Sequence, residues 1–119
     1  MAFKKELSKD KPILTTGVVA SMLEITPDRL RTYDSENLIN THRIKTGQVQ
    51  KRLSSQYDVE WLQCLRALVK NHKMSISSIK ILLQILSINQ KVNMPNNEIG
   101  EILLEMKKNP NFEPVVSKF

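Results

Sequence analysis

Apolar residues recur at helical spacing near the start of the chain, and polar residues divide them into two short segments. Residues 16–23 predict a first helix, capped by Thr15 or Thr16. The side chains expected to be buried are Val18, Val19, Met22 and Leu23. Glu24 and Ile25 form the expected turn, so a second helix should begin directly after them.

This second helix has a strong start signal. Thr26 is a good N-cap, and Pro27 suits the first helical position because its missing N–H needs no partner there. The helix should run to about Glu36, since Asn37 can adopt the left-handed conformation that ends many helices. The side chains expected to face inward are Leu30, Leu38 and Ile39. Two short helices joined by a tight turn have the spacing of a helix-turn-helix.

Residues 40–53 show no helical periodicity. Thr41, Ile44 and Val49 favour strands, and the segment between them contains a glycine. The pattern predicts a two-stranded hairpin, or wing, with its turn near residues 45–47.

A longer helix follows the hairpin. Ser55 is its expected cap, Asp58 is favourable at its positive end, and the pattern continues to about Asn71. The expected apolar stripe consists of Val59, Leu62, Leu65, Leu68 and Val69. Trp61 lies off that stripe and is expected to cover its edge.

The next helix, capped by Ser75, is apolar on two sides. One stripe consists of Ile76, Ile79, Leu82, Leu83 and Leu86, and the other of Ile81, Ile85 and Ile88. A helix that is apolar on two sides is buried on two sides. One face should therefore close the core, and the other should meet the C-terminal helix or a second subunit.

The pattern divides the chain into four parts. Residues 1–12 are expected to be a flexible basic arm, because they carry too little apolar surface to fold alone. Residues 13–88 form the main domain, and residues 95–108 form a last helix that favours homodimer formation. The apolar stripe of this last helix consists of Ile99, Ile102, Leu103 and Met106. Residues 109–119 are expected to be a tail.

Composition and charge narrow the class of protein. The chain has 119 residues, 40% of them hydrophobic, which suits one compact domain with a tail or an extra helix. A single cysteine cannot form an internal disulfide, which favours an intracellular protein. The net charge is +6, and residues 37–57 contain four Lys or Arg side chains and no acid. Such local segregation is typical of a surface that binds nucleic acid.

The second helix also carries candidate chemistry. Thr26, Arg29 and Tyr33 share one side of it by helical spacing, and Arg31 and Thr32 flank that side. A helix N-terminus with arginines and hydroxyls suits a phosphate backbone and base edges. The leading hypothesis from the residues is therefore DNA binding.

The same residues resemble the N-terminal domain of MerR-type transcription regulators. The resemblance covers roughly residues 13–86, about two-thirds of the chain. Its motifs are Thr15-Thr16-Gly17-Val18-Val19-Ala20, Thr26-Pro27, Leu30-Arg31, Tyr33-Asp34, Glu36, Leu38-Ile39, Arg43, Arg52-Leu53 and Ser55. It implies a mainly α fold: a winged helix-turn-helix with a short two-stranded wing, a following helix pair and a short C-terminal dimerisation helix.

The chain departs from the family pattern at several positions. Thr32 replaces the first of two tyrosines, Asp28 stands where a basic residue is common, and Ser54 replaces an aromatic after the wing. The family's effector domain and very long helix have no counterpart here. The chain therefore looks like the short members of the family, such as the heat-shock-repressor branch, which answer to protein partners.

The resemblance also implies a function and its residues. It implies a homodimeric regulator of transcription in the bacterial cytoplasm, bound to an inverted-repeat operator in double-stranded DNA, with a protein co-regulator at the tail as a further partner. Together with the residue chemistry, it assigns DNA contacts to Thr16, Thr26, Arg29, Arg31, Thr32, Tyr33, Arg43, Lys45, Lys51 and Arg52. The expected dimer interface consists of Ile81, Ile85, Ile88, Ile99, Ile102, Leu103 and Met106.

Other interpretations remain open at this point. The arginine-bearing helix face could be merely solvated, with Arg31 paired to Asp34 or Glu36. The domain could serve as an architectural or excisionase-like accessory protein that bends DNA, or as a protein-interaction module. Cys64 is expected to be a small core residue. No enzyme motif, metal site or cofactor motif is found in the sequence, so neither catalysis nor a cofactor is expected.

Overall fold

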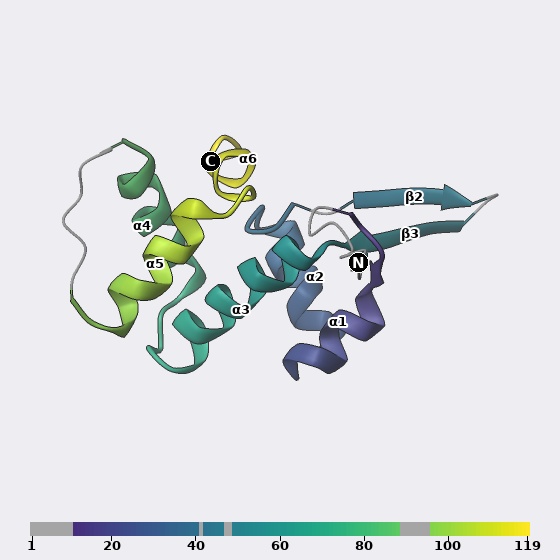
Figure 1. Ribbon diagram of the computed structural model, residues 1–119, viewed down its shortest axis with the longest axis horizontal. Coiled ribbons are helices and arrows are strands. Elements are labelled where there is room, and N and C mark those ends of the chain that lie inside the picture. Colours follow the sequence, from purple (N-terminus) through teal and green to yellow (C-terminus); the bar gives the residue numbers. More distant parts are fainter. Residues whose placement is uncertain (1–10, 41, 47–48, 89–95) are drawn as a thin grey trace, which may run out of the picture.

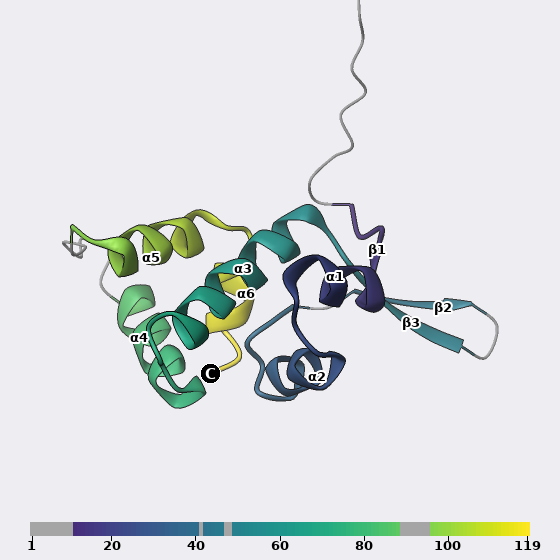
Figure 2. The same cartoon turned by 90° about the horizontal axis from the view of Figure 1, so that it is seen from below.

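The computed structural model describes residues 11–40, 42–46, 49–88 and 96–119. Its longest helix, α3 (Gln56–Lys70), runs through the middle of the molecule. Helices α1 (Thr16–Leu23) and α2 (Pro27–Ser35) lie on one side of α3, and α5 runs along its other side (Figures 1 and 2). The mainly helical, winged helix-turn-helix fold expected from the sequence is confirmed.

Helix α1 begins and ends where its local chemistry predicts. The Thr15 hydroxyl accepts a hydrogen bond from the Val18 N–H at 3.4 Å, and Glu24 ends the helix in the left-handed region with φ 53°. The expected burial, however, is wrong for two side chains, since Val18 is 46% exposed and Met22 53%. The core side of α1 is instead formed by Val19, Ala20 and Leu23.

The wing is confirmed and is larger than expected. Strand β2 (His42–Thr46) pairs antiparallel with β3 (Val49–Ser54), and Thr46 lies opposite Val49. A third strand, β1 (Leu14–Thr15), adds to β3, so the sheet order is β1-β3-β2. The turn expected near residues 45–47 lies partly outside the described residues, and Lys45 lies within β2. The base of the wing is thereby joined to the residue that caps α1.

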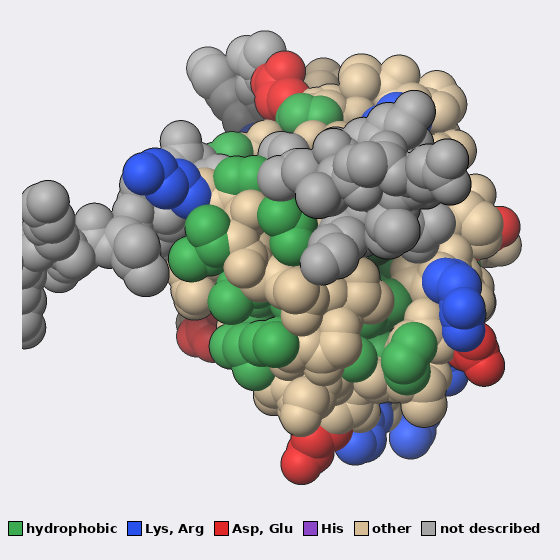
Figure 3. All heavy atoms as spheres, turned by 90° about the vertical axis from the view of Figure 1, so that its right-hand side faces the viewer, with side chains coloured by type: hydrophobic (Ala, Val, Ile, Leu, Met, Phe, Trp, Pro, Cys, Tyr) green, Lys and Arg blue, Asp and Glu red, His purple; other side chains and the backbone are tan. Residues whose placement is uncertain are grey.

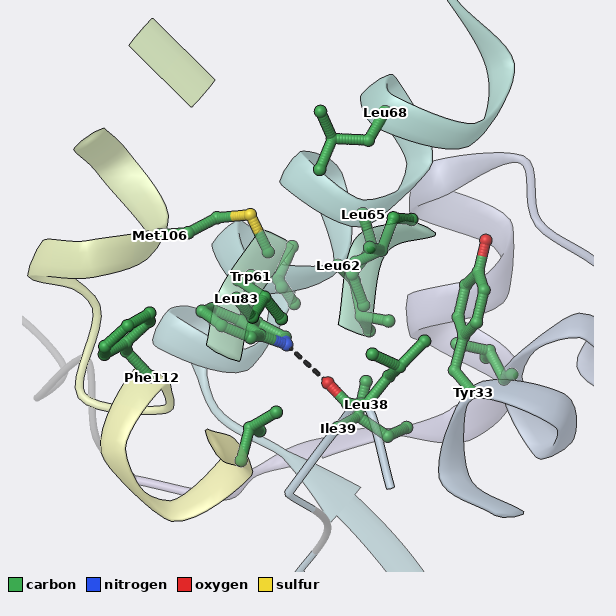
Figure 4. Packing of buried hydrophobic residues seen from close by; sticks show 14 of the residues in the cluster. Tyr33, Leu38, Ile39, Trp61, Leu62, Leu65, Leu68, Leu83, Met106 and Phe112 are labelled. Carbon is green, nitrogen blue, oxygen red and sulfur yellow. Dashed lines mark hydrogen bonds between the residues drawn. The ribbon is translucent and has the colours of Figure 1, made fainter. Parts of the chain in front are cut away.

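Helix α3 holds the core together through Trp61. The indole is 1% exposed, and its Nε1–H donates to the Leu38 carbonyl at 2.7 Å (Figure 4). The expectation that Trp61 covers an edge is wrong. The hydrogen bond gives the indole a partner inside the core, and this partner lies at a distant point of the sequence that helical periodicity does not reveal.

Three further helices complete the chain: α4 (Ile76–Ile88), α5 (Glu98–Lys108) and α6 (Phe112–Val116). Helix α5 is capped by Asn97, whose side chain accepts from the Gly100 N–H at 3.0 Å. Helix α5 packs on α3, and α6 packs on α4. Among the described residues, no helix is both long and apolar enough to cross a membrane.

The packing of α5 and α6 corrects two expectations. Leu103 is 3% exposed and Met106 is fully buried, so both belong to the core of this chain rather than to a dimer interface. The expected tail contains α6, whose Phe112 and Val115 are buried. The amide of Asn111, at the start of α6, donates to Asp58 Oδ1 at 2.8 Å. A polar bond and two apolar side chains therefore fasten the end of the chain to α3 and α4.

Candidate nucleic-acid interface

Helix α2 presents its N-terminal turns to solvent. The Thr26 hydroxyl accepts from the Arg29 N–H at 3.2 Å, which satisfies one of the N–H groups at the start of the helix. Thr26, Arg29, Arg31 and Thr32 are all exposed, while Leu30 is buried and fixes the helix to the core. Figure 2 shows α2 on the outside of the molecule, on the far side of α3 from α5. The positive end of a helix dipole and two guanidinium groups are thus available to an anion.

The two arginines of α2 are in different states. Arg31 pairs with Asp28, not with Asp34 or Glu36, and the two side chains are 65% and 86% exposed. Such an exposed pair is worth little and breaks readily when a better anion arrives. Arg29 makes no hydrogen bond or ion pair through its side chain with any residue the structure describes. Of the two arginines, Arg29 is therefore the one whose guanidinium has no partner among the described residues.

Tyr33 differs from the exposed contact expected from the sequence. The residue is only 2% exposed, and its ring packs in the core cluster with Leu62 and Leu65 of α3 (Figure 4). Arg29 and Tyr33 do lie on the same side of α2. The first turn of that side faces solvent, whereas its C-terminal half faces α3, so Arg29 is exposed and Tyr33 is buried. Tyr33 also lines a hollow together with Thr26 and Arg29, and its hydroxyl points away from Leu38 and Ile39 (Figure 4). Burial raises the pKa of Tyr33, and the charges of Arg29 and Arg66 oppose that rise, so the hydroxyl stays protonated at neutral pH.

The strand pairing sorts the basic positions of the wing. Arg43 is paired with Arg52, Lys45 with Gln50, and Ile44 with Lys51. Paired residues, and residues two apart along a strand, share a face of the ladder. Positions 43, 45 and 52 therefore share one face of the wing, and position 51 is on the other.

The remaining candidate groups do not suit DNA. A hollow of about 640 Å³ between α3 and α5 is lined by Glu60, Glu101 and Glu105 beside Cys64, against the single cation of Lys108. Burial raises the pKa of the Cys64 thiol to about 11, with Glu105 and Glu60 adding to the rise, so the sulfur is a neutral thiol at physiological pH. The described residues contain no cluster of three His, Cys, Asp or Glu side chains that could hold a metal ion.

Comparisons with known proteins agree with this geometry. Residues 14–86 match the model of the MerR HTH family of regulatory proteins, which is more than half of the chain. The structure is similar to that of HiNmlR, described as a MerR family regulator lacking the sensor domain and solved bound to promoter DNA. The TM-score is 0.53 at 28% sequence identity, over 87% of this chain and 70% of that one. Among curated proteins, none matches the chain. The extent of the family match, over the helix-turn-helix, the wing and the helix pair, shows that the chain belongs to the MerR HTH family of regulatory proteins.

Proposed function

We propose that this protein regulates transcription by binding double-stranded DNA as a homodimer, on an operator that is an inverted repeat. The observation that carries the proposal is the exposed, capped N-terminal end of α2, with an unpaired Arg29 beside it and a basic wing at the same end of the molecule. The similarity to HiNmlR, a regulator solved bound to promoter DNA, supports the same reading. The protein would work in the cytoplasm, where its DNA is.

The proposed contact residues divide into two roles. Thr26 and Arg29, at the start of α2, would contact base edges in the major groove, where arginine pairs with guanine through two hydrogen bonds. Thr16, Arg31 and Thr32 would hold the phosphate backbone, which sets the position of the helix without reading sequence. Arg43, Lys45, Lys51 and Arg52 of the wing would hold flanking phosphates. Tyr33 would act through its hydroxyl alone.

The homodimer is supported by an uncovered stripe on α4. Ile81, Ile85 and Ile88 are 58%, 51% and 81% exposed. Their spacing places them on one side of the same helix. Covering these three aliphatic side chains with a second apolar surface would stabilise the assembly by about 25 cal/mol for each Å² of apolar area removed from water. A second copy of the chain, meeting this stripe and the partly buried Ile99 and Ile102 of α5, would supply that surface. The C-terminal end, now folded as α6, is the proposed site for a protein co-regulator.

The proposal is tested by selecting bound duplexes from a random DNA library. We expect enrichment of an inverted repeat whose half-sites are separated by about one helical turn, because a two-fold dimer presents two α2 helices to successive major grooves. Enrichment of a single half-site would contradict the dimer. Binding without any preferred sequence, accompanied by strong bending of the DNA, would instead favour the architectural alternative.

Replacing Arg29 by alanine should reduce discrimination at one base pair by about 1–3 kcal/mol, because a bidentate contact to one base is lost. The measurement is the ratio of dissociation constants for the selected operator and for single-substitution operators. Arg31→Ala is the matched control, because Arg31 is expected to hold phosphate and should weaken all sequences alike. Equal weakening of all sequences by Arg29→Ala would remove it from readout.

Replacing both Arg43 and Arg52 by alanine should lower the slope of log affinity against log salt by about two, since each phosphate contact contributes close to one. The two positions share a face of the wing, and Lys51 lies on the other. Lys51→Ala therefore tests the opposite face in the same titration. If Lys51→Ala changes the slope and the double variant does not, the wing meets DNA with the face opposite to that of the arginines.

A further inference from the structure

The C-terminal end of α2 is joined to α4 by an ion pair. Glu36, the residue that ends α2, accepts a hydrogen bond on its Oε1 from the Lys80 Nζ at 2.9 Å. The Lys80 side chain is 30% exposed and that of Glu36 43%, so water screens this pair less than it screens the pair of Arg31 and Asp28. The contact connects the helix proposed to enter DNA with a helix that lies 44 positions away in the sequence.

Glu36 is a fixed point at the end of α2. Asn37 follows it in the left-handed region with φ 60°, and Leu38 is fully buried, with its carbonyl bonded to the Trp61 indole. The carboxyl end of a helix is also its negative end, where the ammonium of Lys80 is favourable. Lys80 therefore holds α4 to a part of the molecule that the core keeps in place.

Lys80 is in turn held from the side of the C-terminal segment. Its Nζ lies 6.0 Å from the centre of the Phe119 ring, within the range of a cation–π attraction, and Phe119 is partly buried against the core. Lys118 Nζ lies 3.5 Å from Asn40 Oδ1, in the segment after α2. The C-terminal end lies between α4 and α2 in both views of the chain (Figures 1 and 2). The ammonium of Lys80 thus has a partner on each side.

Helix α4 uses its sides for different contacts. Its buried side chains are Ile79, Leu83 and Leu86. The isoleucine stripe is exposed and is the surface proposed to meet a second copy of the chain. Lys80 reaches the end of α2. In the proposed dimer two α4 helices meet, so the distance between the two α2 helices depends on the angle between α2 and α4 in each protomer.

We propose that Lys80 is a specificity-determining residue: by pairing with Glu36 it fixes the angle between α2 and α4, and so sets the half-site spacing that the homodimer accepts. The inference rests on the proposed function, because it requires a dimer joined through α4. One base pair of added spacing moves a half-site by about 3.4 Å along the duplex and turns it by about 35°. A change in the angle of α2 therefore alters the range of spacings that both protomers can reach together.

The test measures dissociation constants for operators with the selected half-site spacing and with one base pair more or less. Lys80→Met removes the ammonium and keeps an unbranched apolar side chain. The preference for the selected spacing should fall about fivefold, the effect of a coupling of about 1 kcal/mol. Affinity for a single half-site should not change, because the exposed residues at the start of α2 are intact. Glu36→Gln should give the same loss, and the double variant no more than either single one.

Two controls accompany these variants. Lys80→Arg keeps a positive charge that can reach Glu36, so the spacing preference should be retained. Lys108→Met makes the same replacement at an exposed position of α5, which lies on the other side of α3 from α2 (Figure 2), and it should leave the preference unchanged. Circular dichroism compares the folding of all the variants with that of the unaltered protein.

Each outcome supports or overturns the role of Lys80. A weaker spacing preference with normal half-site affinity supports it, since a loss of stability alone would weaken half-site and full-site binding together. Such joint weakening overturns it.

An unchanged preference in both Lys80→Met and Glu36→Gln also overturns it and leaves the proposed function intact. The spacing is then set by another surface. Hydrophobic side chains also gather on the face at the wing end (Figure 3), and Ile13 and Met22 are 51% and 53% exposed. If the unaltered protein prefers no spacing, the proposed dimer itself fails, and the inference fails with it.

Discussion

Replacing Trp61 by alanine should lower the free energy of unfolding by about 4 kcal/mol, which is a large share of the stability of a domain of this size. The indole is 1% exposed, so its removal leaves a cavity at the centre of the core. The Leu38 carbonyl also loses its hydrogen bond from Nε1, and Leu38 itself is fully buried. Two separate losses therefore add at one site. Urea denaturation followed by circular dichroism measures the change, because the only tryptophan is the residue replaced.

Two controls separate the contributions. Trp61→Phe keeps much of the aromatic volume and loses the N–H donor, so we expect about half of the effect or less. Val18→Ala, at a position that is 46% exposed, should change stability by less than about 0.5 kcal/mol. A loss below about 1 kcal/mol for Trp61→Ala would mean that the indole does not lie where the core requires it.

Replacing Ile85 by lysine should make the protein monomeric and weaken binding to the full inverted repeat by at least about a hundredfold. Ile85 lies between Ile81 and Ile88 on the exposed stripe of α4, and it is 51% exposed in the single chain. A charge there would have to be buried without a partner in the proposed dimer interface. Binding to one half-site should be unchanged, because the loss is that of the second, linked half-site contact. Analytical ultracentrifugation and titration with full and half operators give the two readouts.

The matched control is Ser87→Lys, which adds the same charge to an exposed position of α4 outside the isoleucine stripe. Its assembly state and operator affinity should remain close to those of the unaltered protein. If Ile85→Lys still forms dimers, the stripe has another occupant and the dimer uses another surface. If it is monomeric but binds the full operator normally, each subunit binds DNA independently.

The starts of the helices could be predicted from the sequence because capping is local chemistry. Thr15, Thr26, Ser55 and Asn97 each accept a hydrogen bond from an N–H three residues later, as their side chains and positions indicate. The left-handed Asn37, with φ 60°, follows from the same kind of local preference. The wing was predictable from its strand formers and its glycine. The exposed isoleucine stripe on α4 was visible in the sequence as a second apolar side.

The sequence could not determine which side of α1 faces inward. Val18 and Met22 are separated by four residues, and so are Val19 and Leu23, so a two-turn helix offers two apolar stripes of equal spacing. The core selects the second pair, which is a property of the neighbouring elements and not of the helix. Strand β1, at two residues, is too short to show a periodic pattern at all.

Tyr33 shows the same limit within the candidate site. Helical spacing placed it on one side with Thr26 and Arg29, and all three do line one hollow. The spacing could not reveal that Tyr33 belongs to the core cluster and is only 2% exposed. Helical spacing within α2 also cannot show that Arg66 and Lys70 of α3, and Lys73 after it, line the same hollow, because these residues lie far along the chain. Their only signal in the sequence is a basic cluster at the end of α3.

Asp58 links the start of α3 to the C-terminal segment of the chain. One of its oxygens accepts from the Ser55 N–H at 2.8 Å and so secures the first turn of α3, directly after strand β3. Its other oxygen accepts from Asn111, and the neighbouring Asn109 donates to the Tyr57 carbonyl at 3.0 Å. Ending the chain before Asn111, or displacing α6, would thus loosen the junction between β3 and α3 at the base of the wing. Through Asp58, the C-terminal segment is thus bonded to the residues at which β3 passes into α3.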